Sequence, residues 1–476
     1  MKNFKYFLII ILALGSFLRV QAADYYWVGG SGNWNDINHW RTTSGGTSFP
    51  SVIPGASDNV YFDANSGFTS SSKTITINVT ANCKNITFSG SAVAPTLTQS
   101  GSQTLNIYGS SVWQAGMGQI NVNNIYYRHT GEAKTITSNG VITGSNSGSV
   151  FFEEENSISL NDEFFASYIY HNAGTFNTNS NNVTISYNYI ANSGTKPRTI
   201  NLGSSTITFK SSMSAFNTNS ANVTLNSGTS HIIFTSLTNS TSSYGIVPYT
   251  NQVFNDVTFE RLGALGGTHS GVVYYNNVVF LGDGNLYGDN NFKSLIFSPS
   301  KTYTLPSGKT QTIVNLFSAN TPQCGGWSTI KSSTAGTQAN ISAAAGVTID
   351  VSGIIIQDVN ATGGANFTAN NSVDNSNNTG WIFPAYTGQD LYWVGGSGNW
   401  NDKAHWSQTS GGTGGYCVPG PGDNVFFDAG SGFTSTNKTV TVDNISYAHN
   451  VTFAGSAVAP TLTQSGSQTL NIYGSS

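Results

Sequence analysis

Internal repetition is the feature that most restricts what this chain can fold into. The segment YWVGGSGNWND at residues 26–36 recurs unchanged at residues 392–402, and the last 22 residues are identical to residues 90–111. DNVYFD at residues 58–63 likewise returns as DNVFFD at residues 423–428. The offset is 366 residues for the first block and 365 for DNVYFD. One long unit is therefore followed by the beginning of a second copy of the same unit.

The repetition divides the chain into four segments. We expect a signal peptide at residues 1–22, a repeat unit with a Trp-rich opening at residues 23–383, a linker at residues 384–389 and an incomplete second copy at residues 390–476. Because the second copy stops while most of the first is still unmatched, we interpret the chain as a fragment of a longer protein.

The N-terminus predicts export. Lys2 and Lys5 precede an apolar run at residues 7–14, and Val20-Gln21-Ala22 has the small residues of a signal-peptidase site. The run is shorter than the roughly 20 apolar residues that a membrane span needs. We therefore expect a secreted protein, located outside the cell or at its surface, with no transmembrane segment after the signal is removed.

Shorter repeats lie within the unit. FNTNSNNVT at residues 176–184 returns as FNTNSANVT at residues 216–224, and DVTF at residues 256–259 is followed by NVVF at residues 277–280. These offsets of 40 and 21 residues match two coils and one coil of a β-solenoid. Asparagine at the corners of such coils tolerates a left-handed backbone and forms hydrogen-bonded ladders.

The residue types support the same fold. Val, Ile, Thr, Phe and Tyr form short runs between Asn, Gly and Ser, and apolar residues at helical spacing are scarce. Coils stacked about 4.8 Å apart bury a continuous core. We predict an all-β fold, a right-handed parallel β-helix with an N-terminal Trp-rich cap, followed by the truncated start of a second like unit. A string of β-sandwiches is the alternative, but its repeat would be near 100 residues.

Charge and cysteine content exclude several functions. Only 8% of the residues are charged, and removal of residues 1–22 leaves 15 basic and 22 acidic side chains, a balance of −7. We therefore expect no nucleic-acid partner. Cys83, Cys324 and Cys417 are too few for a disulfide scaffold and match no zinc motif, so we interpret them as buried or incidental thiols. We predict no cofactor.

Several motifs mark a known architecture. The block WVGGSGNWND at residues 27–36, with HW at residues 39–40 and DNVYFDA at residues 58–64, resembles the opening of repeat units in very large Bacteroidetes surface proteins. The segment from CGGW at residues 324–327 to NNTGW at residues 377–381 resembles their closing coils. The chain is thus similar to secreted, repetitive, adhesin-like β-helix proteins of this group, and also to autotransporter passenger β-helices. The resemblance implies export, often by type IX secretion, and roles as adhesins or in gliding.

An aromatic cluster opens each copy and has two interpretations. Exposed Trp and Tyr rings would stack on sugars, whereas buried rings would cap the open end of a solenoid. We favour the cap, and we expect His39 and His405, each next to a Trp, to have packing roles. The cluster consists of Tyr26, Trp27, Trp34 and Trp40, with the copies Tyr392, Trp393, Trp400 and Trp406.

One neighbourhood is rich in charge. A β-helix polysaccharide lyase needs acidic and basic groups on one face of adjacent coils, usually with Ca²⁺. We instead expect solvated loops here, and no catalytic, cofactor-binding or metal-binding residue. The charged residues are Arg128, His129, Glu132, Lys134, Glu153, Glu154, Glu155, Asp162, Glu163 and His171. A weaker hypothesis places Ca²⁺ at corners near Asp350, Asp358 and Asp374.

These observations predict a function without catalysis. We expect an extracellular structural or adhesive repeat protein at the bacterial cell surface, not an enzyme, with surface glycans or other cells as partners. The alternative is a polysaccharide-active β-helix enzyme or a glycan-binding module. A concave groove lined by Arg128, Glu154 and His171 would favour that alternative.

Overall fold

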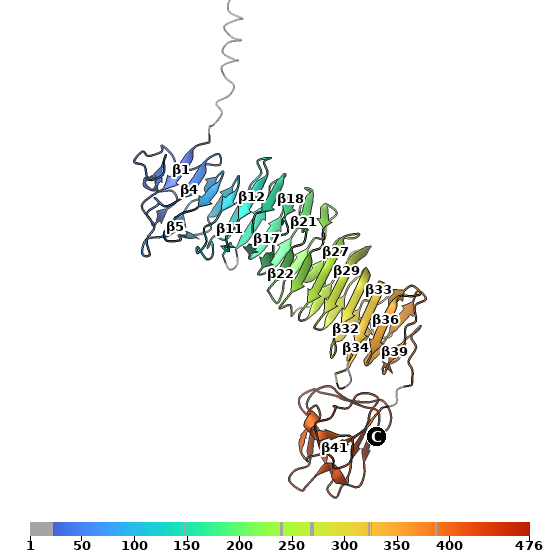
Figure 1. Ribbon diagram of the computed structural model, residues 1–476. Helices are drawn as coiled ribbons and strands as arrows, with labels where there is room; N and C mark the ends of the chain where they lie inside the picture. Colours follow the sequence, from blue (N-terminus) through green and yellow to red (C-terminus); the bar gives the residue numbers. More distant parts are fainter. Residues whose placement is uncertain are drawn as a thin grey trace, which may run out of the picture. The chain divides into compact units, whose positions relative to one another are not determined.

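The computed structural model describes residues 22–145, 148–238, 241–266, 271–321, 324, 326–385 and 388–476 (Figure 1). The predicted signal peptide, apart from Ala22, lies outside the described residues, as do residues 386 and 387 of the predicted linker. The described part of the chain contains no α-helix, and none of its helices is long and apolar enough to cross a membrane. Its helical content is three short 3-10 turns, Ile37–His39, Lys403–His405 and Ala429–Ser431. The prediction of an all-β fold is confirmed.

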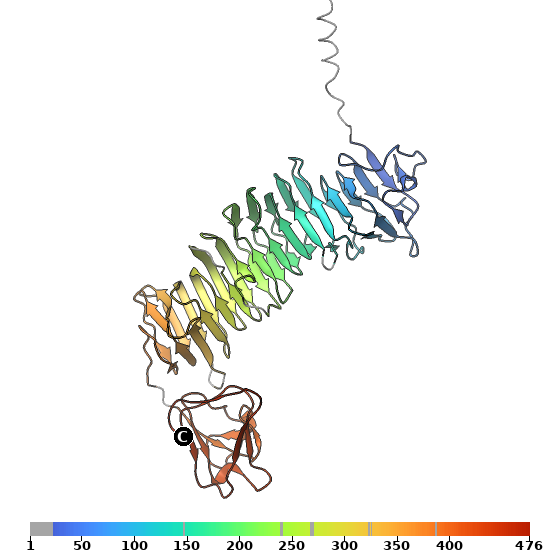
Figure 2. The same cartoon turned by 180° about the vertical axis from the view of Figure 1, so that it is seen from behind.

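The chain forms two compact bodies, which we describe separately. The N-terminal body comprises residues up to 207 together with residues 222–228, and the C-terminal body comprises residues 208–221 and 229–476. In both bodies, strands from successive coils pair in parallel and lie side by side, as Figures 1 and 2 show from opposite sides. The fold is a parallel β-helix.

The N-terminal body has three strand faces. The first follows the order β24 (Val223–Asn226), β21 (Arg198–Asn201), β18 (Gly174–Asn177), β15 (Ser157–Leu160), β12 (Lys134–Thr137), β10 (Ser111–Val112), β7 (Ile86–Phe88), β4 (Asn59–Phe62), β1 (Asp24–Trp27) and β3 (Trp40–Arg41). The second contains β6 (Ala81–Cys83), β9 (Thr104–Ile107), β11 (Asn124–Tyr127), β14 (Ser149–Phe152), β17 (Tyr168–His171) and β20 (Asn188–Ile190). The third contains β2 (Gly32–Asn33), β5 (Thr74–Ile77) and β8 (Thr96–Gln99), then β13 (Ile142–Thr143), β16 (Phe164–Ala166) and β19 (Val183–Ile185).

The C-terminal body continues the same pattern, and β22 (Thr206–Phe209) spans the boundary between the bodies. One of its sheets contains β23 (Ala215–Asn217), β26 (Gly245–Val247), β28 (Gly263–Leu265), β30 (Gly284–Leu286), β32 (Thr302–Leu305), β34 (Ser328–Ser332), β37 (Ile354–Gln357) and β40 (Val373–Asp374). The other contains β25 (His231–Phe234), β27 (Val253–Phe259), β29 (Val272–Phe280), β31 (Asp289–Phe297), β33 (Thr310–Asn320), β35 (Ala339–Ala343) and β38 (Val359–Thr362), with β36 (Thr348–Ser352) and β39 (Ala369–Asn370) branching from β33.

The second copy begins with the same elements as the first. Its sheets contain β41 (Asp390–Trp393), β43 (Trp406–Ser407), β44 (Asn424–Phe427) and β47 (Val451–Phe453); β42 (Gly398–Asn399), β45 (Thr439–Val442) and β48 (Thr461–Gln464); and β46 (Ser446–Ala448) with β49 (Leu470–Ile472). In both copies the opening strand pairs antiparallel with the strand that begins at the last Trp of the cap, β1 with β3 and β41 with β43. This reversal turns the chain back across the end of the solenoid.

The coil length is not constant, and many coils are longer than the predicted length of about 20 residues. Val257, Val278 and Leu295 lie side by side on successive coils, and the step along the chain is shorter for the second pair than for the first. Thr302 pairs with Thr329 across a longer step than either. Longer coils therefore carry their extra residues in the corner loops while the strands stay in register.

The 40-residue repeat does not correspond to two coils, and that interpretation was wrong. Phe176 belongs to β18, whereas its repeat partner Phe216 belongs to β23 in a different sheet. Phe176 pairs with Ile200, and Ile200 pairs with Leu225, so two coils take 49 residues at this point and an offset of 40 residues moves a segment to another face. The 21-residue repeat behaves as predicted, since β27 and β29 are neighbours in one sheet.

Stacked side chains hold the coils together. In the C-terminal body, Phe209, Phe234, Phe259 and Phe280 form a continuous inner stack with ring centroids 4.8, 5.1 and 4.9 Å apart. In the N-terminal body, Asn226 donates to Asn201 (2.7 Å) and Asn201 donates to Asn177 (2.5 Å), which forms an asparagine ladder. Corner residues such as Asn139 and Asn179 adopt a left-handed backbone (φ 47° and 52°). Both asparagine roles that the sequence predicts are thus present.

Candidate functional site

The tryptophans of the first opening are interior residues. Trp27, Trp34 and Trp40 have no exposed surface, and Trp40 packs edge-to-face on Trp27 and Trp34 at 5.0 and 5.2 Å. The indole of Trp40 donates to the Trp34 carbonyl oxygen at 2.9 Å, and that of Trp27 donates to the Gly30 carbonyl oxygen at 2.7 Å. The cap interpretation is confirmed for these rings, because a sugar cannot reach a buried face.

The histidines of both openings pack as predicted. His39 Nδ1 lies 2.7 Å from the Val28 carbonyl oxygen, and its ring stacks on Trp27 at 4.6 Å. A side chain at Gly32 would collide with His39 Nε2, so this position requires glycine. His405 repeats both contacts in the second copy, 2.7 Å from the Val394 carbonyl oxygen and 4.7 Å from the ring of Trp393.

The charged residues of the N-terminal body converge on Glu154. This carboxylate is almost fully buried in direct contact with the buried ammonium of Lys134. It also accepts hydrogen bonds from the backbone N–H groups of Thr130 (3.0 Å), Gly131 (3.1 Å) and Asn156 (3.0 Å). The prediction that these residues form solvated loops is wrong here, because the pair lies inside a corner between two coils.

Burial and the neighbouring charge act in opposite directions on Lys134. Burial lowers the pKa of Lys134 to about 8, and the Glu132 carboxylate opposes this shift. Lys134 therefore keeps its charge at neutral pH, where contact with Glu154 favours the charged form of both groups. A buried pair of this kind is costly to break, because either partner alone would be an uncompensated charge.

More exposed ion pairs surround this centre. Arg128 contacts Glu153, Lys196 contacts Glu155, and His129 Nδ1 lies 3.3 Å from Glu154 Oε1. The side chains of Arg128, His129 and Lys196 are between about a third and a half exposed. Lys196, far away in the sequence, was not recognised as a member of the cluster.

His171 does not join this cluster. Its ring is buried, with Nδ1 2.8 Å from the Tyr189 hydroxyl and Nε2 3.0 Å from the Gly174 carbonyl oxygen. Burial lowers the pKa of His171 to about 4, so the ring is neutral at physiological pH. Since Glu154 is buried as well, the groove of Arg128, Glu154 and His171 that would indicate a lyase is not formed. Of the other two acids, Asp162 accepts from the backbone N–H of Ser138 (2.7 Å), and Glu163 is exposed.

A cavity lies beside the exposed ion pairs. It has a volume of about 470 Å³ and is lined by Tyr108, Arg128, His129, Glu153, Asn172, Ala173 and Lys196. Arg128 also lies over the ring of Tyr126 at 3.9 Å, and Tyr126, Phe151 and Tyr170 form an outer stack spaced 4.4 and 4.9 Å. Sequence reasoning missed this stack, although the aligned strands β11, β14 and β17 each place an aromatic residue at the same position.

The three aspartates of the weak Ca²⁺ hypothesis accept hydrogen bonds from side chains. Asp358 Oδ1 accepts from the amide of Asn377 at 2.6 Å, and this hydrogen bond is the main cause that lowers the pKa of Asp358. Asp374 accepts from the Asn378 amide at 2.6 Å. Asp350 makes long contacts to side chains of β33. Asp358 and Asp374 are thus held by the neighbouring amides Asn377 and Asn378, and in the described residues no three acidic, His or Cys side chains cluster as a metal site would require.

Two of the three cysteines form a disulfide, contrary to the sequence interpretation. Cys324 and Cys417 are bonded, with their Cα atoms 4.7 Å apart and 93 residues apart in the chain. Cys83 is a free, buried thiol whose pKa is raised by burial. The spacing of Cys324 and Cys417 carries no motif, so only their proximity in the fold identifies the bond.

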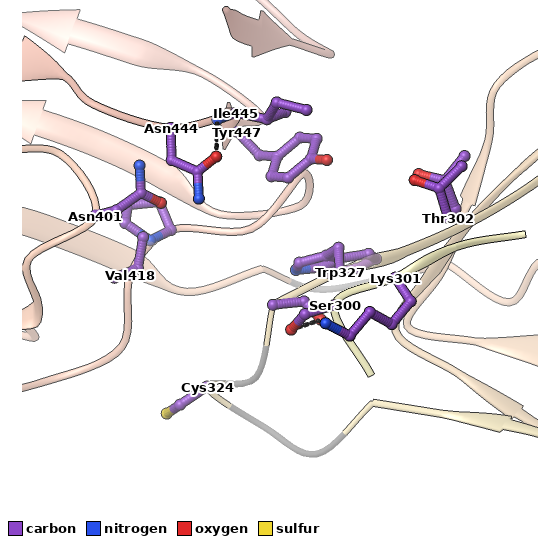
Figure 3. Close-up of a pocket in the computed structure, with 13 residues that line it drawn as sticks. Ser300, Lys301, Thr302, Cys324, Trp327, Asn401, Val418, Asn444, Ile445 and Tyr447 are labelled. Carbon is purple, nitrogen blue, oxygen red and sulfur yellow. Dashed lines mark hydrogen bonds between the residues drawn. The ribbon is translucent and has the colours of Figure 1, made fainter. Parts of the chain in front are cut away.

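The disulfide lies beside a second cavity, of about 350 Å³ (Figure 3). Ser300, Lys301, Thr302 and Trp327 come from the last coils of the first unit. Asn401, Val418, Asn444, Ile445 and Tyr447 come from the second copy and lie across the cavity in Figure 3. The sequence gives no direct signal for this site, because its two sides come from distant parts of the chain.

The fold and these sites define a parallel β-helix repeat protein with buried aromatic caps. Comparison with protein-family models, with curated proteins and with solved structures finds no match.

Proposed function

We propose that this chain is an extracellular structural and adhesive repeat protein at the bacterial cell surface. The observation that carries the proposal is the repetition of a capped β-helix within one chain, with the same Trp cap built at residues 24–41 and 390–407. A solenoid lengthens by adding coils without changing its cross-section, so repeated units set the reach of such a protein.

Two features support an extracellular location. The signal peptide predicted from the sequence would direct export. The disulfide between Cys324 and Cys417 belongs to a class of bond that persists mainly in oxidising compartments outside the cytoplasm.

The cavity beside Arg128 is the best candidate for the adhesive surface. Its guanidinium, the Lys196 ammonium and the edge of the outer aromatic stack lie on one side of the N-terminal body. Cationic groups beside aromatic rings match the carboxylates and apolar faces of acidic sugars. A glycan-binding module is therefore the second candidate. The enzyme alternative has less support, since Glu154 and His171 are buried in structural contacts.

The experiment uses the full chain with pectin, alginate and host-type glycans, with and without Ca²⁺. We expect no release of unsaturated or reducing ends. We also expect retention on immobilised acidic glycans or cell-surface extract to fall in Arg128→Ala and to persist in Lys438→Ala, a control at a lysine outside the cavity. Turnover that disappears in Arg128→Ala would contradict the proposal and establish the enzyme. Retention that is equal in all three proteins would remove the cavity from the adhesive role.

A further inference from the structure

The two copies of the opening differ at the positions that meet the preceding unit. With the offset of 365 residues, Cys417, Gly420 and Tyr447 of the second copy correspond to Val52, Gly55 and Asn82 of the first. The second copy follows the closing coils of a unit. The differences at these positions therefore point to the residues of the second cap that meet that unit.

Two of these positions are more closely packed in the second copy than in the first. Cys417 is 4% exposed, whereas Val52 is 62% exposed. A Cβ at Gly420 would collide with the indole nitrogen of Trp327, whereas the nearest atom to a Cβ at Gly55 belongs to Asp58 of the same loop, at 3.5 Å. The Pro-Gly loop of the second cap thus packs against the closing coils of the first unit.

The residues across the cavity change in character as well. Thr80 and Asn82 of the first copy are replaced by Ile445, which is 52% exposed, and Tyr447, and both line the second copy's side of the cavity. A polar surface of the first copy thus corresponds to an apolar and aromatic cavity wall in the second. Together with the disulfide, these substitutions form one interface, which we call the joint: Cys324 and Trp327 on one side, and Cys417, Ile445 and Tyr447 on the other.

We propose that the joint is a covalent, force-bearing connection that shields the closing coils and the linker from tension. The closing coils of one unit fit the cap of the next unit in the same chain. A force applied to the two chain ends follows covalent bonds, and the disulfide carries it directly from residue 324 to residue 417. Residues 325–416, which include the linker and strands β34 to β43, then lie outside the path of the force. The proposal rests on the structural role given above.

Single-molecule extension of the full chain, held at its two ends, tests the proposal. The 93-residue separation corresponds to roughly 33 nm of chain at about 3.6 Å per residue. We expect the wild-type chain, when fully unfolded, to be shorter than its full contour length by that amount. Cys417→Val, which restores the residue of the first copy, should recover the missing length.

Two controls keep the result specific. Cys83→Ser removes the free thiol and should leave the deficit unchanged. Dithiothreitol, added to wild-type molecules already under tension, should release the same length without relying on the folding of any variant. Cleavage within residues 384–389 should leave two fragments that separate on a gel only after reduction.

A wild-type chain that extends to its full contour length, or cleaved fragments that separate without reductant, would overturn the proposal. Neither measurement uses a glycan or a cell surface. Failure of the joint would thus be distinguishable from failure of the adhesive function.

Discussion

The two copies of the opening share long identical stretches of sequence but not their surroundings. Residues 90–111 and 455–476 are identical, yet Leu97 and Ile107 are completely buried, whereas Leu462 and Ile472 are 43% and 39% exposed. In the first copy the next coil adds β11 beside β9 and a bridge between Thr98 and Asn121. In the second copy, β48 and β49 are the last strands of their sheets.

This difference separates the formation of a strand from the burial of its side chains. The strands form in both copies, where each pairs with a strand of the coil before it, so a following coil is not needed for the strand. Burial belongs to the neighbouring coil, because each coil of a solenoid contacts only the coils before and after it. The Trp caps, in contrast, are buried equally in the two copies, since each is folded from residues of its own opening.

The largest expected effect comes from truncating a buried tryptophan in either of the two caps. Trp34→Ala and Trp400→Ala each remove a fully buried indole, and each should cost about 3–5 kcal/mol of unfolding free energy. The measurement is the unfolding midpoint of the full chain. Phe49→Ala, at a site 55% exposed, is the control and should change little. If Trp34→Ala leaves the midpoint unchanged but abolishes retention on glycans, the cap interpretation fails.

The second prediction concerns the buried pair of the N-terminal body, Lys134 and Glu154. Glu154→Gln leaves the Lys134 ammonium buried without a counter-charge and should destabilise the protein by about 3–5 kcal/mol. Replacing both residues together by Met should be much less harmful, and denaturant midpoints of the three variants measure this. Glu155→Gln, in an exposed pair, is the matched control. Equal midpoints for Glu154→Gln and Glu155→Gln would contradict a structural role for the buried pair.

The third prediction uses the pKa of His171, which is about 4 in the folded protein against 6.5 for a free histidine. The unfolded chain therefore binds more protons between these pH values, and stability should fall as the pH drops from 6.5 to 4, by about 3 kcal/mol for this group. His171→Gln should remove that part of the pH dependence. His129→Gln, at a half-exposed site, should keep it. If stability depends on pH in the same way in the wild type and in His171→Gln, the pKa of His171 is not lowered by its burial.

The sequence predicted the fold better than the sites, for physical reasons. Strand type is a local property and was recovered, as was the 21-residue step from β27 to β29. The 40-residue repeat misled because two coils take 49 residues at this point, from Phe176 through Ile200 to Leu225, so Phe176 and Phe216 fall on different faces. Two further features depend on residues that meet only in the folded chain. The Lys134–Glu154 pair spans 20 residues and the Cys324–Cys417 bond spans 93, and neither has a sequence motif.

The smallest expected effect compares one hydrogen-bond ladder in both copies. Asn59 accepts from Asn85 at 2.7 Å and donates to Asp24 at 2.9 Å, and Asn424 makes the matching bonds to Asn450 and Asp390, both at 2.8 Å. Asn59→Ala and Asn424→Ala should each cost about 1 kcal/mol, because each removes one rung and leaves its partners close to water. Equal shifts in the unfolding midpoint would show that the ladder is a property of the opening itself. A much larger loss for Asn424→Ala would instead show that the contribution of the ladder depends on the surroundings of each copy.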